Sequence, residues 1–230
     1  KSAKINFIDS IDFVNVNFGF EELKTFENLS ITINSGKINL LIGKSGSGKS
    51  TLFSLLLKEN NIDRGEILIN KNNINKFSEK EIYQNISLLP QEPYIFADSI
   101  LENIRIAKPK ASISEVLNSI EISGAFEFIN KLPDKLNTYL SEGGINLSGG
   151  QKQLISLSRI ILSNSKAILL DEPTNNLDEI SINRLKKLLR TWERENKLIL
   201  ISTHDYRLIS ESFVKFEIKN KSIKKFSFQN

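Results

Sequence analysis

Hydrophobic and polar residues alternate along two stretches near the start of the chain, residues 11–18 and residues 29–33. A period of two is typical of a β-strand with one buried face. Residues 38–42 are apolar throughout, which indicates a strand buried on both faces, as in a parallel sheet. The same signals predict further strands at residues 66–70, 86–90, 167–170, 198–202, 213–218 and 222–228.

A helical pattern occupies most of the middle of the chain. Residues 50–58 predict a helix soon after the fully apolar strand. From about residue 94 to residue 163 the pattern is mostly helical, with loops at Pro109 and Pro133. Strand character then returns, so the sequence predicts a strand-and-helix core that is interrupted by a helical insertion.

The composition is that of an ordinary globular protein. The chain has 230 residues, of which 40% are hydrophobic and 25% charged, enough for a substantial core in one large or two small domains. It has no cysteine, which excludes a disulfide framework, a cysteine zinc site and a thiol nucleophile. The net charge of +4 comes from scattered lysines, so we interpret it as a compositional bias rather than as a patch for nucleic acid or a membrane surface.

No apolar run approaches the roughly 20 residues that cross a bilayer, and no signal peptide is recognisable. The chain begins with Lys1 and contains no methionine. We therefore expect it to be a processed product or a piece excised from a longer protein.

A glycine-rich loop follows the apolar strand. Gly43-x-x-x-x-Gly48-Lys49-Ser50 fits the full P-loop pattern, between a strand and a helix as that pattern requires. Its glycines let backbone N–H groups converge on phosphate oxygens, and the helix N-terminus adds its positive dipole. We expect Lys49 to reach the β- and γ-phosphates of ATP and the Ser50 hydroxyl to ligate Mg²⁺; a flexible Gly/Ser turn is the alternative. The expected phosphate-binding residues are Gly43, Lys44, Ser45, Gly46, Ser47, Gly48, Lys49, Ser50 and Thr51.

Two carboxylates end the apolar run at residues 168–170. We expect Asp171, at the strand tip, to hold Mg²⁺, and Glu172 to face the γ-phosphate as a base or water-positioning group. An apolar run followed by Asp-Glu is also typical of a plain strand that enters a solvated turn. The P-loop upstream favours the functional interpretation.

A second anion-binding helix start is predicted at Leu147-Ser148-Gly149-Gly150-Gln151. Two glycines follow a serine and open an apolar-periodic stretch at residues 153–162, which makes this a helix N-terminus. One polypeptide thus carries two phosphate-binding helix starts. A γ-phosphate held from both sides invites a head-to-tail dimer, in which each serine-glycine segment faces the partner's P-loop.

With these motifs in this order, the sequence resembles the ABC ATPases, the nucleotide-binding domains of ABC transporters, from about residue 11 to residue 218. The run Leu-Ser-Gly-Gly-Gln between a P-loop and an acidic strand end is very specific. The resemblance implies an α/β fold: a P-loop NTPase parallel-sheet core, an antiparallel β subdomain near the N-terminus and a helical subdomain. In a single domain 1–230, the core takes about 1–91 and 164–230, and the helical subdomain about 92–163.

The resemblance also implies roles for residues of further motifs. Phe20 falls where the family stacks an aromatic ring on adenine; a core Phe at a strand end is the alternative. Gln91 matches the glutamine that contacts Mg²⁺ and the attacking water, and Asp178 matches the aspartate that communicates across the dimer. His204, the only histidine, matches the switch histidine on the γ-phosphate. The implied sets are Glu172, His204 and Gln91 for catalysis, Ser50, Gln91 and Asp171 for Mg²⁺, and Phe20, Ser148, Gly149, Gly150, Gln151 and Asp178, beside the P-loop, for the nucleotide.

Two positions after the signature depart from the family pattern. Leu154 stands where an arginine is usual, and Ser158 precedes Arg159 where an alanine is usual. Both positions lie on the helix after the signature, away from the residues implied in hydrolysis, so they put only a local salt bridge in doubt. Each position that the family uses for hydrolysis carries the family's residue.

Two stretches favour an exporter over an importer. Residues 91–96, followed by residues 99–104, resemble the exporter pattern, and Glu142-Gly143-Gly144 resembles the acidic loop that exporters place near the coupling helices. Tyr94-Ile95-Phe96 is then an apolar socket for a membrane partner, with plain core packing as the alternative. Against this, Pro173-Thr174 and Thr203-His204-Asp205 are frequent in importer-like ATPases too.

The resemblance therefore implies an ATPase that uses ATP and Mg²⁺ to power transport, more in keeping with export than with import. The implied partners are a second nucleotide-binding domain, identical or different, and a transmembrane domain, fused or separate, at the cytoplasmic face of the plasma membrane. No nucleic acid is expected. One alternative is a soluble ABC-type ATPase that acts on nucleic acid or ribosomes, although no coiled-coil heptads fill residues 59–146. Another is a non-catalytic nucleotide sensor, which the intact Glu172 and His204 disfavour.

Overall fold

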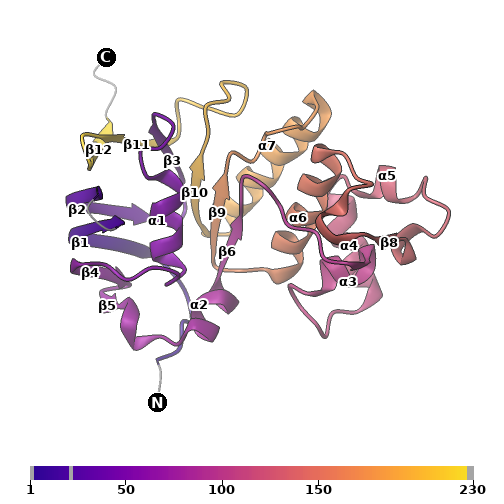
Figure 1. The fold of residues 1–230 in the computed structure, drawn as a ribbon, viewed down its shortest axis with the longest axis horizontal. Helices are drawn as coiled ribbons and strands as arrows, with labels where there is room; N and C mark the ends of the chain where they lie inside the picture. The colour runs from indigo at the N-terminus through magenta and orange to yellow at the C-terminus, as the bar shows by residue number, and fades with distance from the viewer. Residues whose placement is uncertain (1–2, 21–22, 227–230) are drawn as a thin grey trace.

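Two β-sheets lie face to face on one side of the molecule, and a group of helices lies on the other (Figure 1). The structure, a computed structural model, describes residues 3–20 and 23–226. The predicted α/β fold, with a parallel-sheet core, an antiparallel sheet and a helical part, is confirmed. In the described part of the chain no helix is long and apolar enough to span a membrane.

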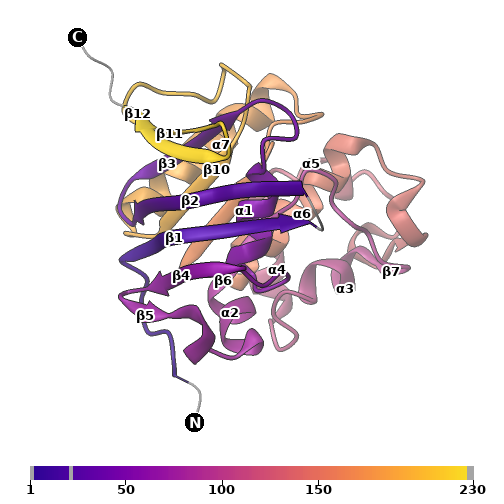
Figure 2. The same cartoon turned by 60° about the vertical axis from the view of Figure 1, so that its left-hand side comes forward.

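The antiparallel sheet has the strand order β2-β1-β4-β5, and Figure 2 shows its strands crossing in front of α1. Along β1 the alternation turns Ile11 and Phe13 into the core, and a break in the strand register between Phe13 and Val16 lets Val16 and Phe18 face the core as well. The strand bounds are β1 Ser10–Phe20, β2 Leu23–Asn34, β4 Arg64–Ile69 and β5 Asn72–Asn73.

The core sheet has the order β12-β11-β3-β10-β9-β6, and every pair in it is parallel except β11 with β12. All residues of β9 and β10 are buried, as their apolar runs predict for strands covered on both faces. The last predicted strand reaches residue 226, and positions 227–228 lie outside the described residues. The bounds are β3 Ile38–Gly43, β6 Ile86–Leu89, β9 Ala167–Asp171, β10 Leu198–Ser202, β11 Val214–Lys219 and β12 Ser222–Phe226.

The helices separate into those that cover the core sheet and those of the insertion. The two-stranded pair β7 (Asp98–Ser99) and β8 (Tyr139–Leu140) also belongs to the insertion. The helix bounds are α1 Lys49–Leu56, α2 Glu79–Asn85, α3 Ile100–Arg105, α4 Ile113–Ser123, α5 Phe126–Ile129, α6 Gly149–Ser163 and α7 Glu179–Arg194, with single 3₁₀ turns at Ile74–Lys76, Lys135–Asn137 and Glu142–Gly144.

Three hydrophobic cores hold these layers together. The first fills the space between the two sheets, around α1. The second lies on the opposite face of the core sheet, under α6 and α7, and the third lies inside the helical insertion. Helix α6 belongs to two cores, because Leu157 packs in the second and Ile155 in the third. The helix that carries the predicted signature therefore joins the insertion to the core sheet.

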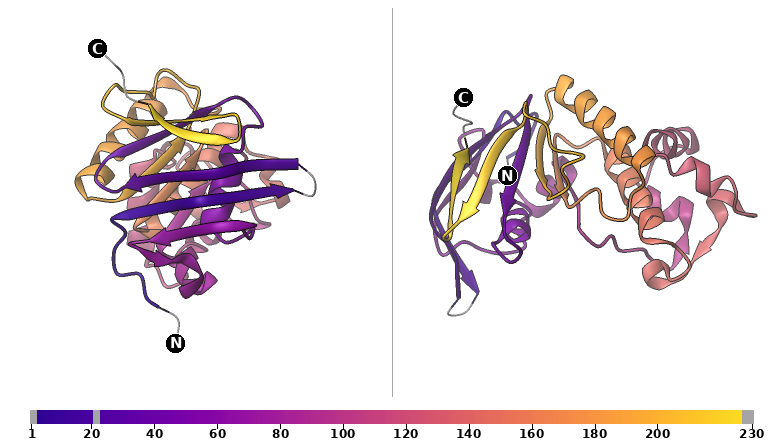
Figure 3. Two further views of the ribbon diagram at one scale, coloured as in Figure 1. Left: turned by 90° about the vertical axis from the view of Figure 1, so that its left-hand side faces the viewer. Right: turned by 90° about the horizontal axis from the view of Figure 1, so that it is seen from above.

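Helix α7 was not predicted from the sequence. It lies along the boundary between the sheets and the helical insertion (Figure 3, right). Its buried residues recur every three or four positions, and Asp178 caps its N-terminus, so both signals of an amphipathic helix are present. The buried residues are Ile182, Leu185, Leu188, Leu189 and Trp192.

Candidate nucleotide-binding site

The glycine-rich loop leaves the carboxyl end of β3 and enters α1 at Lys49. Gly48 caps α1 with φ of +104°, a left-handed conformation that favours glycine. A Cβ at Gly48 would lie 2.8 Å from a methyl carbon of Thr25 and 2.9 Å from the ring of Phe26. Both the backbone turn and the close approach of β2 therefore require glycine at this position.

The Lys49 side chain is buried beneath the loop. Its ammonium donates hydrogen bonds to the carbonyl oxygens of Gly43 (2.9 Å) and Lys44 (3.2 Å), and lies 3.4 Å from Nε2 of His204. The Ser47 hydroxyl is also buried, and no described residue offers it a hydrogen-bond partner. It lies against Gly43, whose Cβ would be 2.6 Å from it, and it does not line the phosphate cavity described below. Lys49 does line that cavity, and an ammonium held only by neutral carbonyl oxygens beside a histidine ring fits a phosphate group.

Asp171, at the carboxyl end of β9, accepts two short hydrogen bonds. Ser50 donates to its Oδ2 at 2.5 Å, and Ser202 at the end of β10 donates to its Oδ1 at 2.5 Å. Hydroxyl and carboxylate oxygens are ligands that Mg²⁺ prefers, usually with substrate phosphates and water completing the shell. Among residues 3–20 and 23–226 no group of three or more His, Cys, Asp or Glu side chains is placed to hold a metal alone. The donor set therefore fits Mg²⁺ bound together with a nucleotide.

Glu172 follows Asp171 with φ of +46°, a strained conformation for a residue other than glycine. Its N–H donates to the Ser202 carbonyl oxygen at 2.8 Å, which fixes the turn to β10. Its carboxylate accepts a hydrogen bond from the His204 N–H at 3.2 Å and lies 3.6 Å from His204 Nε2. The strained turn and these contacts hold the Glu172 carboxylate and the His204 ring side by side.

One cavity of about 470 Å³ brings together most of the predicted phosphate, metal and catalytic residues, from four separate segments, whereas Gly43, Lys44 and Ser47 of the predicted loop do not line it. Gln91, just beyond β6, lines it together with the ends of β9 and β10 and the start of α1. Asn175 lines it too, although it belongs to none of the predicted motifs. Its only signal in the sequence is its place on the loop that follows Asp171 and Glu172. The lining is Ser45, Gly46, Gly48, Lys49, Ser50, Thr51, Gln91, Asp171, Glu172, Asn175 and His204.

Phe20 lies apart from this cavity. It ends β1, its surface is 53% exposed, and its ring meets the Phe18 ring edge-on with centroids 4.9 Å apart. That exposure rules out the core-packing alternative for Phe20. The ring is therefore available to a ligand, whereas Phe18 is buried.

The signature residues line a different cavity, of about 260 Å³, at the start of α6. The Ser148 side chain accepts a hydrogen bond from the Gln151 N–H (3.2 Å), and the Ser148 N–H donates to Gln151 Oε1 (2.9 Å), which forms a capping box. This arrangement leaves the Ser148 hydroxyl hydrogen free to donate. A Cβ at Gly149 would lie 2.8 Å from the Asn176 side chain, and one at Gly150 would lie 2.5 Å from the Asn176 carbonyl oxygen. The glycines are thus needed to let the Asn176 loop pack against the start of α6, and they also leave the first backbone N–H groups of the helix accessible.

The loop after Glu172 connects the two cavities, although no residue lines both. Asn175 lines the phosphate cavity, and the next residue, Asn176, lies against the signature glycines. Asp178 ends the loop, lines the signature cavity and accepts a hydrogen bond from the Ser181 N–H at 2.8 Å. Hydrogen bonding to Ser181 lowers the pKa of Asp178, so its carboxylate is ionised at neutral pH.

The segment after Gln91 is divided between core and surface. Ile95 is fully buried, whereas Tyr94 and Phe96 are exposed and meet edge-on with ring centroids 5.0 Å apart. The segment is therefore neither wholly an exposed socket nor wholly core packing. Ile95 packs in the core of the insertion, whereas Tyr94 and Phe96 stay on the surface. The Tyr94 hydroxyl donates to Glu142 at 2.8 Å, which raises the pKa of Tyr94, and the Gly143 N–H donates to the Ile95 carbonyl oxygen at 2.9 Å. The acidic loop is therefore bonded to this segment.

Arg159 of α6 fixes the same segment from beneath. Its guanidinium donates to the carbonyl oxygens of Tyr94 and Asn103, both at 2.7 Å, and to the Asn103 side-chain oxygen at 2.8 Å. It also lies 5.5 Å from the centre of the Phe96 ring. Burial lowers the pKa of Arg159 to about 10, which leaves it charged at neutral pH. From the sequence alone, Arg159 stands out only as the neighbour of Ser158, a departure from the family pattern.

The chain is similar to known proteins over most of its length. A model of the ABC transporter family matches residues 26–175. A putative export ATP-binding/permease protein of Rickettsia typhi is 41% identical over 196 residues, which cover 84% of this chain and 34% of that protein. The ABC transporter B family member 14 of Arabidopsis thaliana is 38% identical over 199 residues, which cover 86% of this chain and 16% of that protein. The chain thus spans about a third or less of the length of these relatives.

A solved structure shares the whole arrangement. A bacterial Atm1-family ABC exporter with ATP bound superposes with a TM-score of 0.92 at 26% identity, covering 97% of this chain and 39% of that one. The two sheets and the helical insertion therefore recur together in that exporter.

Proposed function

The chain belongs to the ABC transporter family, and from that membership we propose that it binds and hydrolyses ATP to drive export across a membrane. The observation that carries the proposal is the cavity that joins the phosphate loop to Asp171, Glu172 and His204. No other described cavity combines a P-loop with two carboxylates at the end of one parallel strand and a histidine after the next. Such an edge of a parallel sheet is the usual place for a bound nucleotide.

ATP would bind with its triphosphate at the start of α1. The Lys49 ammonium would pass from the loop carbonyl oxygens to the β- and γ-phosphates, and the loop N–H groups would complete the cradle. Phe20, exposed at the end of β1, would stack on the adenine. Ser50 and Asp171 would hold Mg²⁺ with Gln91 close by, and the ion would neutralise charge on the phosphates.

Glu172 and His204 would act at the γ-phosphate. Glu172 would orient a water molecule and accept its proton as the water oxygen attacks phosphorus and the bond to ADP breaks. His204 would donate to the γ-phosphate oxygens, where negative charge collects. The strained backbone at Glu172 and its contacts with His204 support these roles, because they hold both groups in place before the substrate arrives.

Hydrolysis would also need a second copy or a similar domain. The free Ser148 hydroxyl and the N–H groups of Gly149 and Gly150 form an anion site that shares no lining residue with this chain's phosphate cavity. In a head-to-tail pair, each signature would face the partner's γ-phosphate. Asp178 would then lie at the same interface, beside Ser148.

A transmembrane domain would dock on Tyr94 and Phe96, which with Glu142 form the exposed rim of the predicted socket. Arg159 supports this role, since it ties the socket to the signature helix. Closure of the signature onto ATP would then move the socket with it, and the membrane domain would follow. The domain would lie at the cytoplasmic face of the membrane, where ATP is available.

The proposal is tested with this chain together with its membrane domain, fused or co-expressed, reconstituted in lipid vesicles. We expect its ATPase rate to depend on the vesicles and not on added RNA or DNA, and we expect the Lys49→Ala variant to lose the activity. A Lys186→Ala variant, which removes a lysine outside the phosphate cavity, serves as the control. Stimulation by RNA or ribosomes without any response to vesicles would favour the soluble ABC-type ATPase instead.

A further inference from the structure

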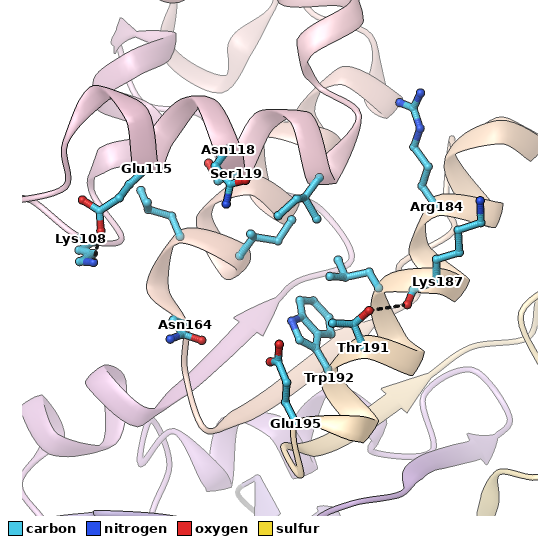
Figure 4. A pocket seen from close by; sticks show the side chains of 14 residues that line it. Lys108, Glu115, Asn118, Ser119, Asn164, Arg184, Lys187, Thr191, Trp192 and Glu195 are labelled. Carbon is cyan, nitrogen blue, oxygen red and sulfur yellow. Dashed lines mark hydrogen bonds and ion pairs between the residues drawn. The ribbon is translucent and has the colours of Figure 1, made fainter.

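Arg184 crosses from helix α7 to the helical insertion. Its side chain leaves α7 and extends away from the Trp192 ring, toward the helices of the insertion (Figure 4). There its guanidinium pairs with Glu127 of α5 and lies over the end of α4, where a Cβ at Gly124 would be 2.4 Å from Nη1 of Arg184. Gly124 has φ of +88°, so both the turn and the close approach of the arginine require glycine.

The packing between α7 and the insertion is open on both sides of Arg184. A cavity of about 550 Å³ lies between α4, the end of α6 and α7 (Figure 4), and the signature cavity of about 260 Å³ lies at the other side. Arg184 is the one described residue that lines both cavities. Where these cavities lie, α7 and the insertion are not packed closely, and the arginine links them across the gap.

The other residues of the signature cavity do not make this link. None of the α6 residues that line it carries a charge, and Leu154 among them stands where an arginine is usual in the family pattern. Lys131 lines the cavity too, but it belongs to the insertion itself. A cation on α6 or at Lys131 would pair with Glu127 inside the insertion, whereas Arg184 joins the insertion to α7.

Arg184 also acts on the loop that follows Glu172. Asp178 ends that loop and lines the same cavity as Ser148 and Arg184. Hydrogen bonding to Ser181 lowers the pKa of Asp178 most, and the charge of Arg184 lowers it further. One guanidinium thus attracts a carboxylate of the insertion and a carboxylate at the start of α7. The planar group, with its several N–H donors and spread charge, suits two carboxylates better than an ammonium does.

We propose that Arg184 is a positioning residue, which holds the helical insertion against α7 so that the signature and Asp178 face a partner copy as one rigid surface. This role rests on the proposed function, because it serves the same head-to-tail pair. An exposed ion pair adds little to folding stability, so its loss should free the insertion to turn without unfolding the chain. Hydrolysis should then slow, since the signature would no longer be oriented before the partner arrives.

The orientation of the insertion is measured as the distance between two spin labels on the 230-residue chain without nucleotide. The chain has no cysteine, so Tyr83→Cys on α2 and Ile113→Cys on α4, both at exposed positions, provide the only labelled sites. We expect a narrow distribution of distances. Arg184→Ala and Glu127→Ala should each broaden it about two-fold or more, and the double variant should broaden it no further, because the two side chains act through each other.

A second ion pair of α7 provides the matched control. Arg190 pairs with Glu193 at 2.8 Å and its side chain is 42% exposed, against 35% for Arg184, but both members of this pair lie on α7. Arg190→Ala should therefore leave the distribution unchanged. Arg184→Lys keeps the charge and should broaden it less than Arg184→Ala does. Equal distributions for Arg184→Ala and Arg190→Ala, with both chains folded by circular dichroism, would overturn the proposed link.

The effect on hydrolysis is measured separately, on the chain together with its membrane domain in lipid vesicles. We expect Arg184→Ala to lower kcat about three-fold or more and to leave KM for ATP within about two-fold, since Arg184 does not line the phosphate cavity. A broadened distribution with normal kcat would overturn the effect on hydrolysis and keep the link. An unsubstituted protein without ATPase activity would contradict the proposed function and leave the distance result standing.

Discussion

The phosphate loop and the signature are both helix starts that can bind an anion, but they differ in what surrounds them. Lys49 and Ser50 each have a partner within the chain, and Asp171, Glu172 and His204 lie in the same cavity. The signature has only its capping box and the Asn176 loop. On the proposed roles, the groups for hydrolysis therefore lie together in the phosphate cavity, whereas none of them lines the signature cavity.

The largest effect is expected from removing the base on the phosphate side. Glu172→Gln keeps the shape of the side chain but cannot take a proton from water, so we expect steady-state ATP hydrolysis to fall about 100-fold or more. Nucleotide affinity, measured by equilibrium binding, is expected to stay within about two-fold. The matched control is Glu179→Gln, the same change at an exposed carboxylate outside the phosphate cavity, which should leave the rate unchanged. Normal turnover by Glu172→Gln would show that Glu172 is not the base that accepts the proton from water.

A smaller effect is expected on the signature side, from the link between α6 and the socket. Arg159→Lys keeps a charge but loses the fork that holds Tyr94 and Asn103, so we expect vesicle-dependent ATPase activity to fall about ten-fold. ATP affinity should not change, because Arg159 does not line the phosphate cavity. Arg190→Lys is the control, since Arg190 also lies over an aromatic ring, that of Phe213, but away from the socket. Unchanged vesicle dependence in Arg159→Lys would leave Arg159 with a packing role only.

The smallest effect is expected at Phe20, which lies outside the phosphate cavity. Phe20→Ala should weaken ATP binding about five-fold or more, because an aromatic ring stacked on a base contributes about 1–3 kcal/mol. Phe20→Tyr keeps the ring and should bind normally. Inorganic tripolyphosphate, which has no base, should bind Phe20→Ala and the unchanged chain equally. Equal ATP affinity of Phe20→Ala and the unchanged chain would show that the exposed ring makes no contact with the nucleotide.

The sequence predicted those parts whose signals are local. The apolar run of β3 and the glycines before Lys49 act over a few residues, so the strand, the loop and the helix followed directly. The same holds for Asp171 and Glu172 at the end of β9. What the sequence could not predict depends on contacts between distant segments.

Asn176 is the clearest case of this second kind. It matters because the signature glycines, more than twenty positions earlier, leave room for its backbone. Arg159 is similar, since its partners lie more than fifty residues away. Helix α7 is different: its cap and its periodicity were present in the sequence and were overlooked. The cavity of about 550 Å³ beside Trp192 (Figure 4) likewise has no local signal, because side chains of α4, α6 and α7 form it together.

The central claim, that two copies share each ATP, is tested most directly by sedimentation of the Glu172→Gln chain with ATP and Mg²⁺. We predict a dimer that holds two ATP molecules and falls apart when ATP is removed. Adding Ser148→Arg places a bulky side chain at the signature without touching this chain's own phosphate cavity, so the double variant should stay a monomer with one ATP bound. A dimer that persists with Ser148→Arg, or a Glu172→Gln chain that binds ATP and remains a monomer, would contradict the claim.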